Sequence, residues 1–172
     1  MEFMEVIKGR RSVRKFKDLA VGEEIIEELL KAAQMAPSAG NLQARDFIIV
    51  TSKITKQKLT KAALGQSFIE QAPVVIVVIA NIERSSRIYR SRGELYAIQD
   101  ATAGIENMLL TAYSMGLGTC WIGAFDENAV SELLGIPDKT LPVAIISAGY
   151  PDEQPVMPPR IAMEKIVHRE TW

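Results

Sequence analysis

The chain has 172 residues, enough for one domain with a continuous hydrophobic core and no need of disulfides or a structural metal. Its 20 Lys and Arg nearly balance its 21 Asp and Glu, and the formal net charge of -1 favours neither nucleic acid nor an anionic membrane as a partner. The single cysteine, Cys120, and the single histidine, His168, exclude an internal disulfide and a Cys/His zinc site built from this chain alone.

The first fifty residues predict two helices, a charged surface segment and one strand. Apolar residues recur at helical spacing over Glu2–Lys8 and Glu23–Ala33, so we expect helices there. The stretch Gly9–Val21 between them is dense in charge and lacks helical periodicity, which indicates an extended or looped segment. The proline, glycine and small polar residues of Met35–Asn41 end the second helix in a loop, and Phe47–Val50 follows as a strand.

The middle of the chain predicts a buried strand between two helices. A polar helix is expected over Lys53–Ala63, and the β-branched run Ala72–Ala80 is typical of a strand buried on both faces. Ser91 and Glu94 have the spacing of a capping box. The apolar stripe Leu95–Met115 behind them predicts a helix of roughly 30 Å, at ~1.5 Å per residue.

The last third completes a sheet that helices cover on both faces. Strands are expected over Thr119–Gly123 and Leu141–Gly149, with a helix capped by Asp126 between them. Several links are too irregular for simple right-handed crossovers. We therefore predict an α+β fold, a three-layer α/β/α sandwich with a mixed, mainly antiparallel sheet. It forms a single domain over residues 1–172, whose apolar tail, about 151–172, is an extended packing arm.

No segment predicts membrane insertion. The start, Met1–Arg14, lacks an apolar core followed by a small-residue cleavage site. The longest apolar run, Ala72–Ala80, is far shorter than a bilayer span. We expect a cytoplasmic protein.

The sharpest local feature is Lys8–Lys17, which carries six cations in ten residues. Guanidinium groups bind a phosphate bidentately, and a serine hydroxyl adds a neutral donor. In an extended segment Arg10, Ser12 and Arg14 project to one side, where one phosphate could collect all three. From residue types alone, a solvated basic face or a nucleic-acid arm has about equal weight. The lack of interleaved aromatic residues speaks against nucleic acid.

Two loops suit binding better than proton transfer. Pro37–Gln43 offers backbone donors and carboxamides but no acid or base, although a plain helix-ending loop is the alternative. Cys120–Ala124 is apolar and small and could present backbone N–H groups to a flat heterocycle, or it is simply a short edge strand. The glycines at Gly116–Gly118 lack the G-x-G-x-x-G spacing and end a helix, which excludes a Rossmann site.

No side chain is predicted to act as a catalytic acid, base or nucleophile. Cys120 lies in an apolar run and is expected to be buried, while His168 lies among charges in the tail. A protein with enzyme-like loops and no such groups must take its reactivity from a cofactor. The small residues Ala101, Ala103 and Gly104 on the long helix leave core packing and a dimer contact as equal alternatives.

Three stretches, in this order, resemble the nitroreductase family of FMN enzymes: Arg10–Phe16, Ala36–Gln43 and Gly116–Gly123. The likeness runs over nearly the whole chain, including Ala72–Ile76 and Gly149–Pro151. It implies a domain-swapped homodimer with the long helix at its core and the C-terminal arm packed on the partner subunit. Two FMN sites would lie at the interface, each built from both subunits.

The resemblance also implies which residues bind FMN. One group would hold the phosphate and ribityl end, with a tail arginine closing over the phosphate. A second group would come from the partner subunit, and a third would line the isoalloxazine near N5. In that order the residues are Arg10, Arg11, Ser12, Arg14 and Arg160; Pro37, Ser38, Ala39, Asn41 and Gln99; and Trp121, Ile122, Gly123 and Ala124. Larger members have a glutamate where this sequence has Gly123, so that side-chain contact is missing.

The implied reaction carries hydride from NAD(P)H through flavin N5 to an electron-poor acceptor, such as a nitroaromatic or a quinone, by a ping-pong mechanism. The link Asn81–Glu94 is short beside larger members, whose extra helices roof the site. We expect Arg87, Tyr89 and Arg90 to form a smaller roof that meets the nucleotide phosphates. Flavin or pteridine reduction and reductive dehalogenation on the same site are alternatives, as is a flavin-binding dimer without turnover.

Overall fold

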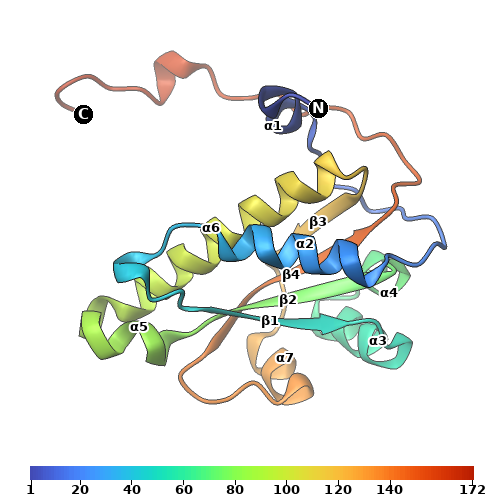
Figure 1. The fold of residues 1–172 in the computed structure, drawn as a ribbon, viewed down its shortest axis with the longest axis horizontal. Helices are drawn as coiled ribbons and strands as arrows, with labels where there is room; N and C mark the ends of the chain where they lie inside the picture. The colour runs from blue at the N-terminus through green and yellow to red at the C-terminus, as the bar shows by residue number, and fades with distance from the viewer.

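A four-stranded antiparallel sheet forms the centre of the computed structural model, which describes residues 1–172 (Figure 1). Its strands are β1 (Arg45–Val50), β2 (Val74–Ala80), β3 (Gly118–Ile122) and β4 (Leu141–Gly149). They lie in the order β1-β2-β4-β3, so β1 and β3 are the edges. The α+β class is therefore confirmed.

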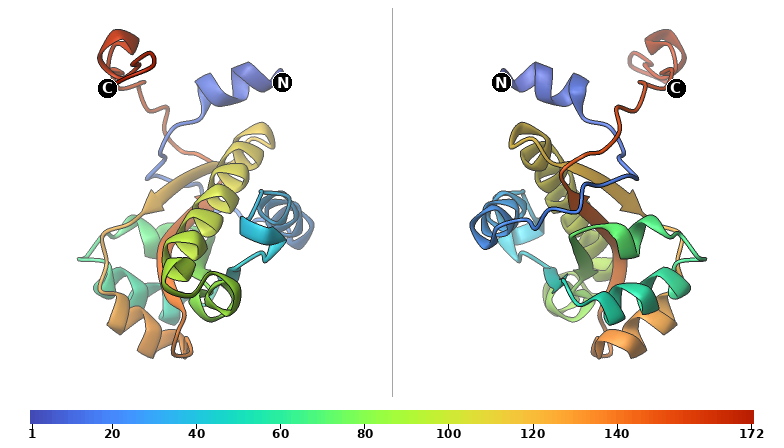
Figure 2. Two further views of the ribbon diagram at one scale, coloured as in Figure 1. Left: turned by 90° about the vertical axis from the view of Figure 1, so that its left-hand side faces the viewer. Right: turned by 90° about the vertical axis from the view of Figure 1, so that its right-hand side faces the viewer.

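Helices cover both faces of this sheet (Figure 2). On one face lie α2 (Glu23–Gln34) and α6 (Gly93–Ser114), and on the other lie α3 (Lys53–Ala62), α4 (Phe68–Gln71) and α7 (Glu127–Leu134). Each face has its own hydrophobic core, with 18 buried residues on the α2/α6 side and 11 on the other. The predicted three layers are present.

The period of the apolar residues explains both cores. Every residue of β2 is buried, and its alternate side chains enter opposite cores: Val74, Ile76 and Val78 on one face, Val75 and Val77 on the other. The stripe predicted on α6 likewise faces the sheet. Its buried members are Ala97, Ala101, Ile105, Met108, Leu109 and Ala112.

Parallel pairing is limited to one isolated bridge, so the sheet is less mixed than expected. Ser12 bridges Thr119 in parallel, and the Val13 N–H donates to the Thr119 carbonyl at 2.8 Å. Further along, the Lys17 N–H donates to the Tyr150 carbonyl at 2.9 Å. The basic segment thus lies along the β3 edge and the end of β4 without becoming a strand.

The segment before α6 differs from the prediction. The link that was expected only to be short contains a helix, α5 (Ile82–Tyr89), followed by the 3₁₀ turn η2 (Arg90–Arg92). The α5 N-cap Asn81 accepts a hydrogen bond from the Arg84 N–H at 2.9 Å. The capping box at Ser91 and Glu94 was wrong. Ser91 lies inside η2, and α6 begins after Arg92 without a side-chain cap.

Both chain ends project from the body. The short helix α1 (Phe3–Gly9) and the arm after Tyr150 leave from the same end of the molecule (Figures 1 and 2). The arm has one 3₁₀ turn, η3 (Met163–Lys165), and Trp172 is fully exposed, with His168 stacked on it at 4.5 Å between ring centroids. No helix combines the length and the apolar character that a membrane span requires.

Candidate functional site

The first candidate cavity, of about 420 Å³, lies where the basic segment passes the C-terminal end of α6. Its wall includes the end of α1, the turn from α6 into β3, and the start of the arm. The lining residues used below are Gly9, Arg10, Arg11, Val13, Tyr113, Gly118 and Glu153. It combines two arginines with a backbone turn rich in glycine.

Close packing fixes the basic segment against the sheet. Val13 is buried, and a Cβ on Gly118 would lie 2.8 Å from the Val13 Cβ, so only glycine allows this approach. On the other side the Glu153 carboxylate accepts from the Arg14 N–H at 2.5 Å and the Lys15 N–H at 3.1 Å. The backbone that carries the arginines is therefore held at two points.

The arginines of this segment have no carboxylate partner, since none of the five ion pairs in the structure includes them. Arg11 donates through Nη1 to the Lys8 and Arg10 carbonyls at 2.6 and 2.7 Å. Arg14 turns toward α4, with its guanidinium 5.8 Å from the centre of the Phe68 ring. Uncompensated guanidinium groups beside a cavity suit an anionic ligand.

The strand-like alternation expected for the segment is not observed. Arg10 and Arg11 line the cavity together, while Ser12 and Arg14 do not. The physical reason is that only Ser12 pairs with β3, so the backbone is not held in a regular strand on either side of it. Proximity to a phosphate is thus favoured for Arg10 and Arg11 in this conformation.

The segment after Cys120 lies on the β3 edge of the sheet. Trp121 is 37% exposed, Ile122 is buried, and Gly123 and Ala124 are exposed. The Ala124 carbonyl accepts from Gln66 Nε2 at 3.1 Å, which ties this segment to the turn between α3 and α4. An open strand edge ending in small residues can receive a flat ligand.

Cys120 itself faces the protein interior. It is 2% exposed, and burial raises the pKa of its thiol, while nearby Arg14 acts in the opposite direction. The reactive species of a cysteine is the thiolate, which burial disfavours. This agrees with the expectation that Cys120 is not a nucleophile.

We therefore expect Cys120 to resist alkylation in the folded protein. Iodoacetamide at neutral pH should modify it slowly without denaturant and rapidly in urea, with intact-mass measurement following the reaction. Equal rates in the two conditions would contradict its burial.

The second candidate cavity, of about 250 Å³, lies at the other end of α6. Its lining combines the loop after α2 with one face of the helix: Pro37, Ser38, Ala39, Tyr96, Gln99, Asp100 and Ala103. Four of the residues expected to act together, Pro37, Ser38, Ala39 and Gln99, are thus brought together. Asn41 lies in the adjoining 3₁₀ turn η1 (Ala39–Asn41) and outside the lining.

A buried ion pair anchors this loop to α6. Arg45 and Asp100, whose side chains are each 2% exposed, are in contact through Nη1 and Oδ1. Arg45 Nη2 also donates to the Gln34 and Ala36 carbonyls at 2.9 and 2.8 Å. One guanidinium thereby satisfies backbone acceptors where the helix ends and the loop begins.

Asp100 completes the network from α6. Its Oδ2 accepts from the Ala44 N–H at 2.6 Å. Burial raises the pKa of Asp100, while the Ala44 N–H and Arg45 favour its charged form. Sequence reasoning missed this pair; the available signal was a carboxylate inside the apolar stripe of the long helix.

Backbone geometry shapes the loop itself. Gly40, Asn41 and Gln43 all have positive φ angles, of 56°, 54° and 49°. The Gln43 N–H donates to Ser38 Oγ at 3.0 Å, and Gln43 Nε2 lies 3.3 Å from Asn41 Oδ1. These bonds close the loop on itself, so its small residues form a preorganised wall.

Of the residues expected to form a roof, Tyr89 lies beside this second cavity. Tyr89 makes an edge-to-face contact with Tyr96, with 4.8 Å between ring centroids, and a Cβ on Gly40 would lie 2.8 Å from the Tyr89 hydroxyl. Arg87 is exposed and pairs with Glu83 at 3.6 Å, whereas Arg90 is exposed and unpaired. Tyr89 is therefore grouped with the Pro37–Ala39 loop and Gln99 at the second cavity, and not with Arg10 at the first.

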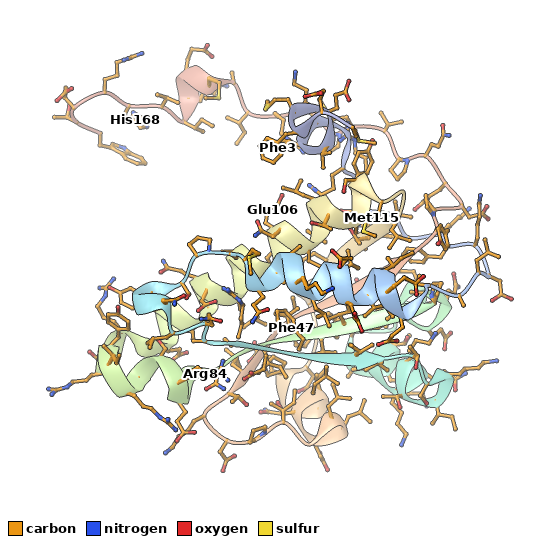
Figure 3. All side chains as sticks on the ribbon, viewed as in Figure 1. Phe3, Phe47, Arg84, Glu106, Met115 and His168 are labelled. Atoms are coloured by element: carbon orange, nitrogen blue, oxygen red, sulfur yellow. The ribbon has the colours of Figure 1, made fainter.

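The two cavities lie at opposite ends of α6. Gln99 lines one and Tyr113 the other, and 14 residues of helix separate them by roughly 21 Å at ~1.5 Å per residue. Arg160 joins neither group, since it is exposed in the arm and donates to the Pro158 carbonyl at 3.3 Å. Figure 3 labels His168 further along the same arm, away from the sheet.

Comparison with known proteins supplies the context of this site. A profile of the Nitroreductase family matches residues 7–68 and 61–150. A protein of Archaeoglobus fulgidus, named for NADH dehydrogenase or NAD(P)H nitroreductase activity, is 35% identical over 99% of both chains. An FMN reductase [NAD(P)H] of Bacillus subtilis is 32% identical over 98% of this chain and 74% of its own length.

A solved structure agrees with these sequence matches. The NADPH:FMN oxidoreductase of Vibrio harveyi, complexed with NAD+, superposes with a TM-score of 0.92 at 28% sequence identity. The match covers 99% of this chain and 77% of that one. The matched region takes in nearly all of this chain, and with it the residues that line the two cavities.

Proposed function

Since this chain belongs to the nitroreductase family, we propose that it is an FMN-dependent oxidoreductase that takes reducing equivalents from NAD(P)H. The names of its relatives support both halves of the proposal, because they include FMN reductases and NADPH-dependent flavin oxidoreductases and nitroreductases. The chemistry of the two cavities agrees with a flavin that the protein binds and orients.

The observation that carries the proposal is the set of unpaired arginines beside the first cavity. Arg10 and Arg11 line it, and no carboxylate lies within 4 Å of either guanidinium. The FMN phosphate carries about -1.5 to -2 charges at neutral pH and accepts several hydrogen bonds. Arg10 and Arg11 fit such a group as they stand, whereas Ser12, Arg14 and Arg160 would have to turn toward the cavity when FMN binds.

A homodimer explains why the predicted site is divided between two cavities. Residues roughly 21 Å apart along one helix, by the rise of ~1.5 Å per residue, cannot surround a single flavin ring. A second copy related by a two-fold axis would bring its Pro37–Ala39 loop and Gln99 to the Arg10 cavity of the first copy. The first copy would bring the same residues to the Arg10 cavity of the second. Each site would then take residues from both subunits.

The arm has the properties of a segment that packs on a second copy. Its apolar side chains are exposed in the single chain, among them Val156, Met157, Ile161, Met163 and Trp172. The outer edge of β1 offers it a place to pair, because Phe47 and Ile49 direct their backbone groups away from β2. Figure 3 labels Phe47 on this edge. We therefore propose a domain-swapped arrangement.

Most of the protein's contribution is orientation. A flavin held by these residues would supply the chemistry of hydride transfer at N5, from NAD(P)H to an electron-poor acceptor in alternating half-reactions. The exposed β3 end at Trp121–Ala124 would lie along the ring, where backbone N–H groups orient it without a side-chain acid or base. Nitroaromatics and quinones are the proposed acceptors.

Two other readings of the same site make different predictions. Reduction of free flavin, a pteridine or a halogenated substrate would appear as turnover with those acceptors and little with nitroaromatics or quinones. A flavin-binding dimer without turnover would stay coloured when NADH or NADPH is added.

The spectrum of the purified protein tests the proposal. We expect a yellow dimer that anaerobic NAD(P)H bleaches and an acceptor recolours. Arg10→Gln should weaken FMN binding by about tenfold or more, because a hydrogen bond from a charged group contributes about 1.5–3 kcal/mol. Lys58→Gln, which removes one exposed charge from α3, is the matched control. A colourless protein that does not take up FMN would contradict the proposal.

A further inference from the structure

An arginine-rich turn, residues 84–92, lies next to the second cavity, and FMN binding does not account for its positive charges. Of its four arginines, Arg84 contacts Asp46 at 2.9 Å and Arg87 pairs with Glu83 at 3.6 Å. Arg90 and Arg92 are exposed and have no carboxylate within 4 Å. The turn therefore presents two uncompensated positive charges.

Arg92 is held in one place although it is exposed. Its guanidinium carbon lies 5.0 Å from the centre of the Tyr96 ring, and its Nε donates to the Tyr96 hydroxyl at 2.8 Å. Both contacts leave the two Nη groups free to donate. A stacked arginine that keeps its forked donors is preorganised for phosphate.

The face of α6 connects this arginine with the cavity. Arg92, Tyr96, Gln99 and Ala103 follow one another at helical spacing on one side, and the last three line the cavity. A ligand that extends from the cavity toward the start of α6 would thus meet Tyr96 and then Arg92.

The turn is also fixed to the loop that forms the opposite wall. Tyr89 contacts the Tyr96 ring on one side, and its hydroxyl approaches Gly40 on the other. The positive φ of Arg90, 47°, reverses the chain directly after α5 and brings Arg90 next to the start of α6. Arg92 is therefore held beside Tyr96 of the cavity wall, and Arg90 lies two residues before it in the same turn.

We propose that Arg92, assisted by Arg90, forms a subsite for a phosphate of the nicotinamide nucleotide. This rests on the proposed function and assigns the nucleotide a direction, with its nicotinamide toward Gln99 and a phosphate toward the start of α6. It replaces Arg87 of the sequence-based expectation by Arg92, because Arg87 has a carboxylate partner and Arg92 has none. The phosphate is either the pyrophosphate, common to NADH and NADPH, or the 2′-phosphate of NADPH alone.

The test compares Arg92→Gln, Arg92→Lys and the control Lys58→Gln as flavin-loaded proteins. Binding of NADP+ and NAD+ to the oxidised protein is measured by calorimetric titration, and KM is measured for NADPH and NADH. Arg92→Gln should raise the Kd and KM by about tenfold to a hundredfold. Arg92→Lys, which keeps the charge but not the planar fork, should lie between Arg92→Gln and the unaltered protein.

The two nucleotides separate the sources of the phosphate. Weaker binding of NADP+ alone would identify the 2′-phosphate, and equal weakening of both would identify the pyrophosphate. Unchanged binding of both in a yellow Arg92→Gln protein with normal thermal stability would overturn the subsite. That result would leave FMN dependence intact, whereas a colourless unaltered protein would contradict the proposed function itself.

Discussion

Replacing Asp100 with asparagine should lower the free energy of unfolding by about 3–5 kcal/mol, the range for removing one partner of a buried ion pair. The reason is that Arg45 would keep its charge in a site where its side chain is only 2% exposed. The loop after α2 should also loosen, because Arg45 holds the Gln34 and Ala36 carbonyls. Urea denaturation of the FMN-saturated protein, at one fixed protein concentration, measures the loss.

An exposed ion pair provides the control. Lys31 and Glu28 lie 2.8 Å apart with both side chains more than half exposed, so Lys31→Gln should change stability by less than about 1 kcal/mol. The double variant Arg45→Met/Asp100→Leu should recover only part of the loss, because it leaves no charge unpaired but removes the partners of the Gln34 and Ala36 carbonyls and of the Ala44 N–H. If Asp100→Asn were no more destabilising than Lys31→Gln, the assigned role of the buried pair would be wrong.

Replacing Gly93 with alanine should destabilise the protein by about 1–3 kcal/mol, the usual cost of overpacking. A Cβ at this position would lie 2.5 Å from the Ser86 Cα and 2.7 Å from the Ser86 N, and a backbone cannot move aside like a side-chain end. Helix propensity favours alanine by at most about 1 kcal/mol, so the clash decides the sign.

The readouts for Gly93→Ala are the thermal midpoint and the KM for NADPH, because α5 carries Tyr89 toward the second cavity. Ser91→Ala is the control two residues away. Ser91 is exposed and makes no capping bond, so its replacement should change stability by no more than about 0.5 kcal/mol. An unchanged midpoint in Gly93→Ala would show that α5 and α6 do not depend on this close approach.

Much of the fold could be predicted from hydrophobic periodicity. The run in β2 and the stripe on α6 each identify one element, since every second or every third to fourth residue must be apolar to reach a core. Helix α5 was missed because its sequence, IERSSRIY, is mostly polar and its fit depends on Gly93 in the next helix. Ser91 was predicted as a helix cap because its spacing to Glu94 matches a capping box, and the sequence pattern does not reveal the turn η2 in which it lies.

The segments that make up the site could be predicted from the sequence, but the contacts between their side chains could not. The basic stretch is visible in composition, yet the direction of Arg14 depends on Phe68 of α4. Arg45 and Asp100 lie 55 residues apart, and neither has a neighbour in sequence that reveals the other. Contacts of this kind follow from how the elements pack, which no local pattern records.

The length of α6 fixes the distance between the residues at its two ends. In the proposed dimer one end of this helix contributes to one active centre and the other end to the second, so their separation is set by 22 residues of continuous helix. A one-residue insertion within it would rotate Gln99 relative to Tyr113 by about 100° and shift it by ~1.5 Å. Insertions during evolution should therefore accumulate in the arm or in the turn after α5, and not between these two residues.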